Sequence, residues 1–239
     1  MTSLLYQTDS YLQAFDARVT GVDTEARAIV LDATAFYPGG GGQPCDLGAL
    51  VVDGATFPIV RVKKQGDDVL HFVDGEAPLP ATGAQVRGQI DWERRYQSMR
   101  THSAMHVLCG VIFRDYGALV TGCNFEPLQG HMDFEFERMQ AELVKNIEEA
   151  VNMEIGKNHE VRVKTLPREE AFRIPDLIRT KINLLPEGIT QVRTVEIVGL
   201  DLQADGGTHV RNTSEIGRVR ILDYKSKGAS NKRIYIAVE

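Results

Sequence analysis

Cysteine is scarce in this chain, which has three thiols among 239 residues. Cys45, Cys109 and Cys123 cannot all pair, and their spacing matches neither a CxxC motif nor a small disulfide framework, so we predict free thiols. Long apolar runs are also missing: the longest, residues 105–113, covers nine residues, whereas about 20 are needed to cross a bilayer. The sequence therefore excludes a disulfide scaffold and a chain anchored by membrane-spanning helices.

The first ten residues, MTSLLYQTDS, lack the basic cluster and apolar core of a targeting segment, so we expect a cytoplasmic protein.

Basic side chains are slightly fewer than acidic ones, 27 against 33. The net charge of −6 argues against a polyanion binder held only by long-range attraction. The charge is uneven, however: residues 1–90 carry six basic and eleven acidic side chains, and residues 211–233 carry seven basic and two acidic ones. A nucleic acid would therefore bind the second part of the chain.

The pattern of apolar residues changes near residue 91. Before that point, short apolar runs alternate with Gly-Asp, Asp-Gly and other glycine-containing turns, which predicts six strands and hence a small β-barrel. We expect these strands at residues 18–22, 28–31, 49–52, 57–62, 69–73 and 85–90. Residues 1–90 are accordingly assigned to a barrel domain.

Helical periodicity begins at Trp92 and predicts a helix over residues 92–116. A second helix over residues 139–156 is indicated by apolar side chains spaced by four. Further strands are expected at residues 130–137, 160–165, 191–198, 217–224 and 233–238. The predicted class is α+β, with a small N-terminal β-barrel followed by an antiparallel-sheet α+β domain over residues 91–239.

Two pairs of metal-binding side chains, each spaced by four residues, are the strongest chemical signal. His102 and His106 lie in the predicted helix, where positions i and i+4 share a face, so both imidazoles can bind one ion at about 2.0–2.1 Å. Asp205 and His209 are separated by glycines that let the backbone approach a ligand. Three imidazoles and one carboxylate form a donor set that suits zinc.

Spacing alone leaves other interpretations of these residues open. Two histidines four apart can form a polar helix edge, and Asp-Gly is a common hairpin signal, so DGGTH can be a turn with an exposed histidine. The helix pair is also similar to the HExxH motif of zinc peptidases. That chemistry needs a Glu beside the first histidine as general base, and position 103 is Ser, so a peptidase is disfavoured.

Three segments together carry a family resemblance. They are ATAFYPGGGGQPCDLG (residues 33–48), RTHSAMHVL (residues 100–108) and DLQADGGTHVRNTSEIG (residues 201–217). In this order they resemble the alanyl-tRNA editing proteins, often called AlaX, which are freestanding relatives of the editing domain of alanyl-tRNA synthetase. The resemblance spans nearly the whole chain and implies an N-terminal barrel with a glycine-rich motif and a C-terminal metal domain.

The same resemblance implies a reaction and a partner. The expected activity is hydrolysis of the ester that joins serine or glycine to the 3′-terminal ribose of mischarged tRNA(Ala), with one Zn²⁺ per chain held by His102, His106, Asp205 and His209. The family usually has cysteine where Asp205 stands. Because a carboxylate is a harder ligand than a thiolate, we expect weaker zinc binding and easier acceptance of other divalent ions. Cys109 can substitute as a ligand or pack against the sheet.

Residues for substrate selection and tRNA contact are also expected. Thr121 follows the metal helix near the position where the family places a polar group facing the substrate; the alternative is a threonine at a strand end. Gly41, Gly42 and Gln43 are expected near the tRNA end, although a wide flexible turn is an alternative, and the run lacks the GK[ST] ending of a phosphate loop. The bound metal can activate water or hold the substrate, and the sequence does not choose between these roles.

Basic side chains between residues 157 and 181 outnumber acidic ones, so some are expected to contact tRNA phosphates rather than form a solvated face. They are Lys157, Arg162, Lys164, Arg168, Arg173, Arg179 and Lys181. We favour a monomer. The alternative functions are a tRNA-binding module of the same family without hydrolytic activity, and a metal hydrolase acting on small esters or amides.

Overall fold

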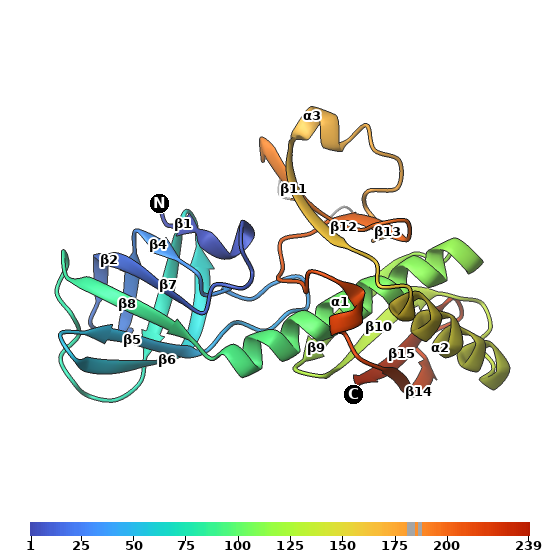
Figure 1. The fold of residues 1–239 in the computed structure, drawn as a ribbon, viewed down its shortest axis with the longest axis horizontal. Coiled ribbons are helices and arrows are strands. Elements are labelled where there is room, and N and C mark those ends of the chain that lie inside the picture. The colour runs from blue at the N-terminus through green and yellow to red at the C-terminus, as the bar shows by residue number, and fades with distance from the viewer. Residues whose placement is uncertain (181–184, 186–187) are drawn as a thin grey trace. The chain divides into compact units, whose positions relative to one another are not determined.

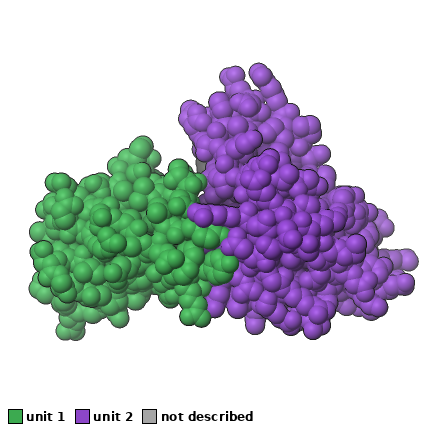
Figure 2. Space-filling model, in the orientation of Figure 1, with its two compact units in different colours: residues 1–96 green, residues 97–239 purple. Residues whose placement is uncertain are grey.

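The computed structural model describes residues 1–180, 185 and 188–239 and confirms the α+β class with an N-terminal barrel (Figure 1). Two compact units, residues 1–96 and 97–239, are coloured separately in Figure 2. The sequence places the boundary near residue 91, and the division between the units falls within helix α1 (Trp92–Tyr116). Among the described residues, no helix combines the length and the apolar character that a membrane crossing requires.

The first unit contains a closed barrel of six antiparallel strands in the order β2-β3-β7-β6-β5-β8. The strands are β2 (Ala14–Asp23), β3 (Ala28–Leu31), β5 (Gly48–Val52), β6 (Ala55–Gln65), β7 (Asp68–Val73) and β8 (Gln85–Ile90). Each expected strand is present. Alternate side chains point inward, so Phe15, Leu50 and Ile59 fill the centre of the barrel.

Three short elements of the first unit were not anticipated. Strands β1 (Ser3–Leu4) and β4 (Ala33–Thr34) form a two-stranded parallel pair, and the 3₁₀ turn η1 (Leu5–Gln7) follows β1. Two-residue strands carry too few side chains to show an alternation in the sequence. Their pairing depends on contacts between distant segments.

Helix α1 has well-defined ends. The Asp91 side chain accepts a hydrogen bond from the Arg94 N–H at 3.2 Å and caps the N-terminus. At the other end Gly117 adopts φ 65° and its N–H bonds to the Phe113 carbonyl, which is a common way to end a helix. Residues 101–112 are buried on every side, so α1 is the central helix of the second unit.

Two antiparallel sheets complete the second unit. The four-stranded sheet has the order β14-β15-β10-β9, and the three-stranded sheet has the order β11-β12-β13. Their strands are β9 (Val120–Glu126), β10 (Gln129–Glu135), β11 (Val161–Pro167), β12 (Gln191–Ile197), β13 (Asp201–Ala204), β14 (Val219–Ser226) and β15 (Asn231–Val238). Strands β9 and β13 were not predicted, and both turn out to border the candidate site.

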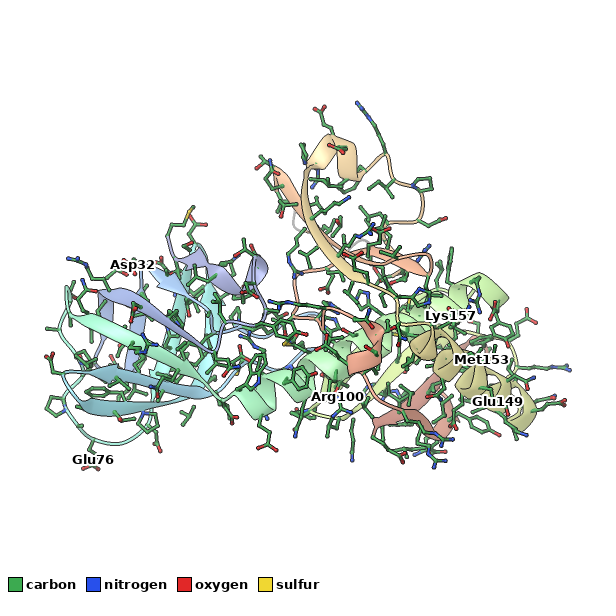
Figure 3. The ribbon with its side chains drawn as sticks, in the orientation of Figure 1. Asp32, Glu76, Arg100, Glu149, Met153 and Lys157 are labelled. Atoms are coloured by element: carbon green, nitrogen blue, oxygen red, sulfur yellow. The ribbon has the colours of Figure 1, made fainter. Side chains whose placement is uncertain are left out.

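The remaining helices lie in the second unit. Helix α2 (Ala141–Gly156) buries Ile147, Val151 and Ile155, as its spacing predicts, and contacts β14. Figure 3 shows Glu149, Met153 and Lys157 along its outer side, where all three are exposed. A short helix α3 (Arg168–Ala171) follows β11, and the 3₁₀ turn η2 (Thr213–Glu215) is closed by a capping box from Asn212 to Glu215.

Candidate metal centre

The structure brings the four predicted metal ligands together. His102 and His106 lie one turn apart on α1, and Asp205 and His209 lie in the loop that follows β13. One donor atom from each residue lies within 4.8 Å of the other three. All three histidines are buried and Asp205 is half-buried, so the group forms a shielded cluster rather than a polar helix edge with an exposed histidine.

Two contacts of Asp205 have lengths close to the ligand spacing around a tetrahedral ion. Four nitrogen and oxygen ligands at about 2.0–2.2 Å from such an ion lie about 3.4 Å from one another. Asp205 Oδ1 is 3.5 Å from His102 Nε2, and Asp205 Oδ2 is 3.1 Å from His209 Nε2. All four donor atoms lie within 4.8 Å of one another, so a bound ion would draw the more widely spaced donors closer together.

Two of the imidazoles have a polar partner on the side away from the cluster. His106 Nδ1 is 3.2 Å from Asp201 Oδ2, and His209 Nδ1 is 3.1 Å from Ser103 Oγ. Ser103 Oγ also accepts a hydrogen bond from the Val210 N–H at 3.2 Å, which ties α1 to the segment that carries His209. Outer contacts of this kind orient metal-binding histidines. Ser103 thus has a structural role at the position where a zinc peptidase has its base.

Electrostatics favours the protonation states that bind metals. Burial is the main cause that lowers the pKa of His102 well below its usual range and that of His209 to about 4. Burial opposes ionisation of Asp205, but the nearby His102 and the hydrogen bond with His209 hold its pKa well below the usual range. At neutral pH the cluster therefore contains a carboxylate and two neutral imidazoles, and a metal ion would displace the proton that His209 Nε2 donates to Asp205.

His106 differs from the other two histidines. Burial lowers its pKa, but the hydrogen bond to Asp201 and the charge of Asp201 offset this effect, so the pKa is raised from its ordinary value. A metal ion must therefore compete with a proton most directly at His106.

Asp205 is held by its own loop and by strand β12. Its Oδ2 accepts a hydrogen bond from the Gly207 N–H at 2.7 Å, and its carbonyl accepts one from Arg193 Nη1 at 2.9 Å. This leaves Oδ1 directed at His102, 3.5 Å from its Nε2. Cys109, the alternative ligand, is not in the donor group found among the described residues, and burial raises the pKa of its thiol well above the usual value. A buried neutral thiol suits packing better than ligation.

Thr121 lies at a bulge in β9. The register of β9 with β10 shifts there: Gly122 pairs with Asp133, and Val120 pairs with Phe134. The Thr121 side chain is exposed, and its hydroxyl donates to Asn231 Oδ1 at 2.8 Å. Phe125, on the same strand, has its ring centre 5.1 Å from that of His102. A substrate contact of Thr121 stays a prediction.

The glycine run forms a tight turn in the first unit. Gly40 and Gln43 exchange two backbone hydrogen bonds of 2.9 and 3.1 Å, so Gly41 and Gly42 are the two central residues of the turn. Their φ values of 58° and 88° have the positive sign that a type I′ turn needs. The turn is tight, not wide, and differs from a phosphate-binding loop. Gly41 is exposed and the Gln43 side chain is buried, and their contact with tRNA stays a prediction.

Several of the basic side chains singled out in the sequence have acidic partners. Lys157 Nζ donates to Glu154 at 2.8 Å, and Arg162 donates to Glu160 at 2.6 Å. Lys164 is exposed, and Lys181 lies outside the described residues. Contacts of this group with tRNA phosphates stay a prediction.

Sequence reasoning missed two polar side chains at the cluster, Asp201 and Arg193. Asp201 begins the four-residue strand β13, which is too short to show an alternation in the sequence. Arg193 lies on the neighbouring strand β12 and had no signal either, because a single arginine in an apolar strand does not show what it will contact.

Two segments of the chain match family models of tRNA synthetases. Residues 10–94 match the family model of class II (A) tRNA synthetases, and residues 192–235 match that of the threonyl and alanyl tRNA synthetase second additional domain. The chain is thus built from parts related to tRNA synthetases.

Full-length relatives then identify the family. The chain is 42% identical to the alanyl-tRNA editing protein AlaX-M of Saccharolobus solfataricus over 100% of both chains. It is 41% identical to AlaX-M of Methanosarcina mazei over 100% of this chain and 97% of the relative. The alanine–tRNA ligase of Pyrococcus furiosus is 39% identical over 92% of this chain and 24% of the ligase. The chain belongs to the AlaX-M family of alanyl-tRNA editing proteins.

Proposed function

We propose that this protein is an aminoacyl-tRNA deacylase that hydrolyses mischarged Ser-tRNA(Ala), and also Gly-tRNA(Ala), in trans. Water is added across the ester between the amino acid and the terminal ribose, which releases the free amino acid and intact tRNA. The observation that carries the proposal is the buried cluster of three histidines and one aspartate, in a chain that aligns over its full length with AlaX-M proteins.

The proposed metal is Zn²⁺ or another divalent ion, held by His102, His106, Asp205 and His209. When bound, such an ion can polarise the ester carbonyl or lower the pKa of a water molecule. The chain itself supplies three buried imidazoles and a carboxylate whose pKa is well below its usual range. The position of the Asp205 carboxylate 3.1 Å from His209 Nε2 and 3.5 Å from His102 Nε2 supports a ligand role for aspartate at the usual cysteine position.

A second, hydrolytic check is needed for a physical reason. A synthetase pocket shaped for alanine discriminates against a side chain of nearly the same size by only about 1–3 kcal/mol. The editing site must spare alanine, and a buried polar group that loses its partner costs about 1–3 kcal/mol, which is enough to favour serine. We propose Thr121 as the residue that contacts the serine hydroxyl. Its hydroxyl donates to Asn231 Oδ1 and keeps lone pairs that can accept a hydrogen bond from serine, and bound substrate would bury this exposed group.

We further propose that the turn at Gly41 and Gly42, together with Gln43, contacts the tRNA end. We also propose that basic side chains of residues 157–181 and 211–233 contact the tRNA phosphates. The proposed partner is mischarged tRNA(Ala), bound by a monomer in the cytoplasm. Solvent exposure of Gly41 and Lys164 supports these roles.

The test is deacylation of Ser-tRNA(Ala), Gly-tRNA(Ala) and Ala-tRNA(Ala) by the zinc-loaded protein. We expect hydrolysis of the first two, little of the third, and loss of activity in His209→Ala. His131→Ala is the matched control, because His131 lies on β10 outside the donor group. Binding of tRNA without turnover would indicate a tRNA-binding module, and hydrolysis of free esters independent of tRNA would indicate a general hydrolase.

A further inference from the structure

Asp201 is a buried carboxylate that three side chains approach. It is the first residue of β13, and its Oδ2 lies 3.2 Å from His106 Nδ1 and accepts a hydrogen bond from Gln203 Nε2 at 2.7 Å. Its Oδ1 lies 3.4 Å from Arg179 Nε. A carboxylate only accepts hydrogen bonds, so the shared proton between Asp201 and His106 belongs to Nδ1.

A proton on Nδ1 leaves the lone pair of neutral His106 on Nε2, the nitrogen on the far side of the ring from Asp201. We propose that Asp201 is a positioning residue that fixes the tautomer and the ring orientation of His106 for metal binding through Nε2. This inference rests on the proposed metal centre. It assigns a role to a residue that is not itself a ligand.

The Asp201 carboxylate can lie close to α1 because Gly110 has no side chain. Gly110 lies one turn after His106, and a β-carbon there would be 2.9 Å from Leu200 Cγ and 3.0 Å from Asp201 Cβ. Only glycine leaves room for residues 200–201 against the helix at this point. The close approach of residues 200–201 to α1 therefore requires glycine at position 110.

Arg179 is also fixed in place. Its guanidinium carbon lies 3.7 Å from the centre of the Phe113 ring, near the end of α1, and its backbone carbonyl accepts a hydrogen bond from the Val120 N–H. A guanidinium held on an aromatic face has little freedom to turn away from Asp201. Arg179 and Gln203 thus restrain the carboxylate, and the carboxylate restrains His106.

An amide cannot replace this carboxylate without a conflict. An asparagine has one oxygen, whereas Asp201 meets donors on both oxygens. If the amide NH₂ faced His106, it would favour the tautomer with the proton on Nε2, which blocks metal binding. If the NH₂ faced away from His106, it would oppose the Arg179 donor.

The experiment compares zinc affinity of Asp201→Asn with that of the wild type by competition with a chelator. We expect affinity to fall about 10–100-fold, as for other outer partners of histidine ligands. Asp133→Asn is the matched control, because Asp133 is also a buried carboxylate, paired with Arg233 at 2.6 Å, and should keep wild-type affinity. Unchanged affinity in a folded Asp201→Asn protein would overturn the inference.

A second measurement does not depend on the variant folding. NMR of the zinc-loaded wild type should show a proton on Nδ1 of His106 and no proton on Nε2. Zinc bound through Nδ1 would contradict the proposal. If the wild type binds no divalent ion at all, the proposed metal-dependent function fails instead, so the two failures are distinguishable.

Discussion

Protonation of His71 is expected to destabilise the barrel in mild acid. His71 lies on β7 and is fully buried; its Nδ1 is 3.0 Å from the Ile29 carbonyl and its Nε2 is 2.8 Å from Thr34 Oγ1. Because the carbonyl only accepts, Nδ1 carries the proton, and Nε2 of the neutral ring accepts from the Thr34 hydroxyl. A second proton on Nε2 would reverse the direction of that bond and place a positive charge in the core.

The size of the effect follows from the shift in pKa. Burial lowers the pKa of His71 from 6.5 to about 4. The unfolded chain therefore binds the proton first, and stability is full above pH 6.5 and falls as the pH drops towards 4. With about 1.4 kcal/mol for each pKa unit, the loss from this residue is about 2 kcal/mol at pH 5 and about 3 kcal/mol at pH 4.

The assay is denaturant unfolding of metal-free wild type and His71→Gln at pH 7.5 and pH 5. Glutamine can keep both hydrogen bonds but does not titrate, so other groups contribute equally to the two proteins. We expect the wild type to lose about 2 kcal/mol more than His71→Gln between the two pH values. Equal losses would refute the idea that His71 is buried in its neutral form.

Three further outcomes are expected. Asp205→Cys should keep deacylation and bind zinc more tightly, since a thiolate is the softer ligand; an inactive variant would show that the carboxylate does more than bind the metal. Zinc at 1,000 times its dissociation constant should raise the free energy of unfolding by about 4 kcal/mol, and excess chelator should remove this increase in a thermal melt. Gly48→Ala should destabilise the barrel far more than Gly54→Ala. A β-carbon at Gly48 would lie 2.1 Å from the Gln89 carbonyl oxygen, whereas a β-carbon at Gly54 would have no atom of the described residues within 4 Å apart from those of the adjoining residues. Similar melting temperatures would contradict this.

Local patterns were sufficient for much of the fold. The six barrel strands and helix α2 follow from periodicity, because one face of each element is buried in a regular way. Helix α1 was also predicted, although its middle part is buried on every side. Strand β9 was missed because it contains Gly122 and Asn124, which have low strand propensity, and because the bulge at Thr121 interrupts the alternation of its side chains. Its place is set by pairing with β10, which a local pattern does not reveal. The four residues of β13 are too few to show their period.

The sequence by itself determined which side chains can bind a metal. His102 and His106 share a helix face because of their spacing, and Asp205 and His209 stay close together because a short loop joins them. The tertiary structure alone decided that both pairs converge within 4.8 Å and that Asp201 and Arg193 surround them. The reason is physical: spacing acts along one helix or loop, whereas burial, outer hydrogen bonds and the resulting pKa values arise from segments about a hundred residues apart that pack together on folding.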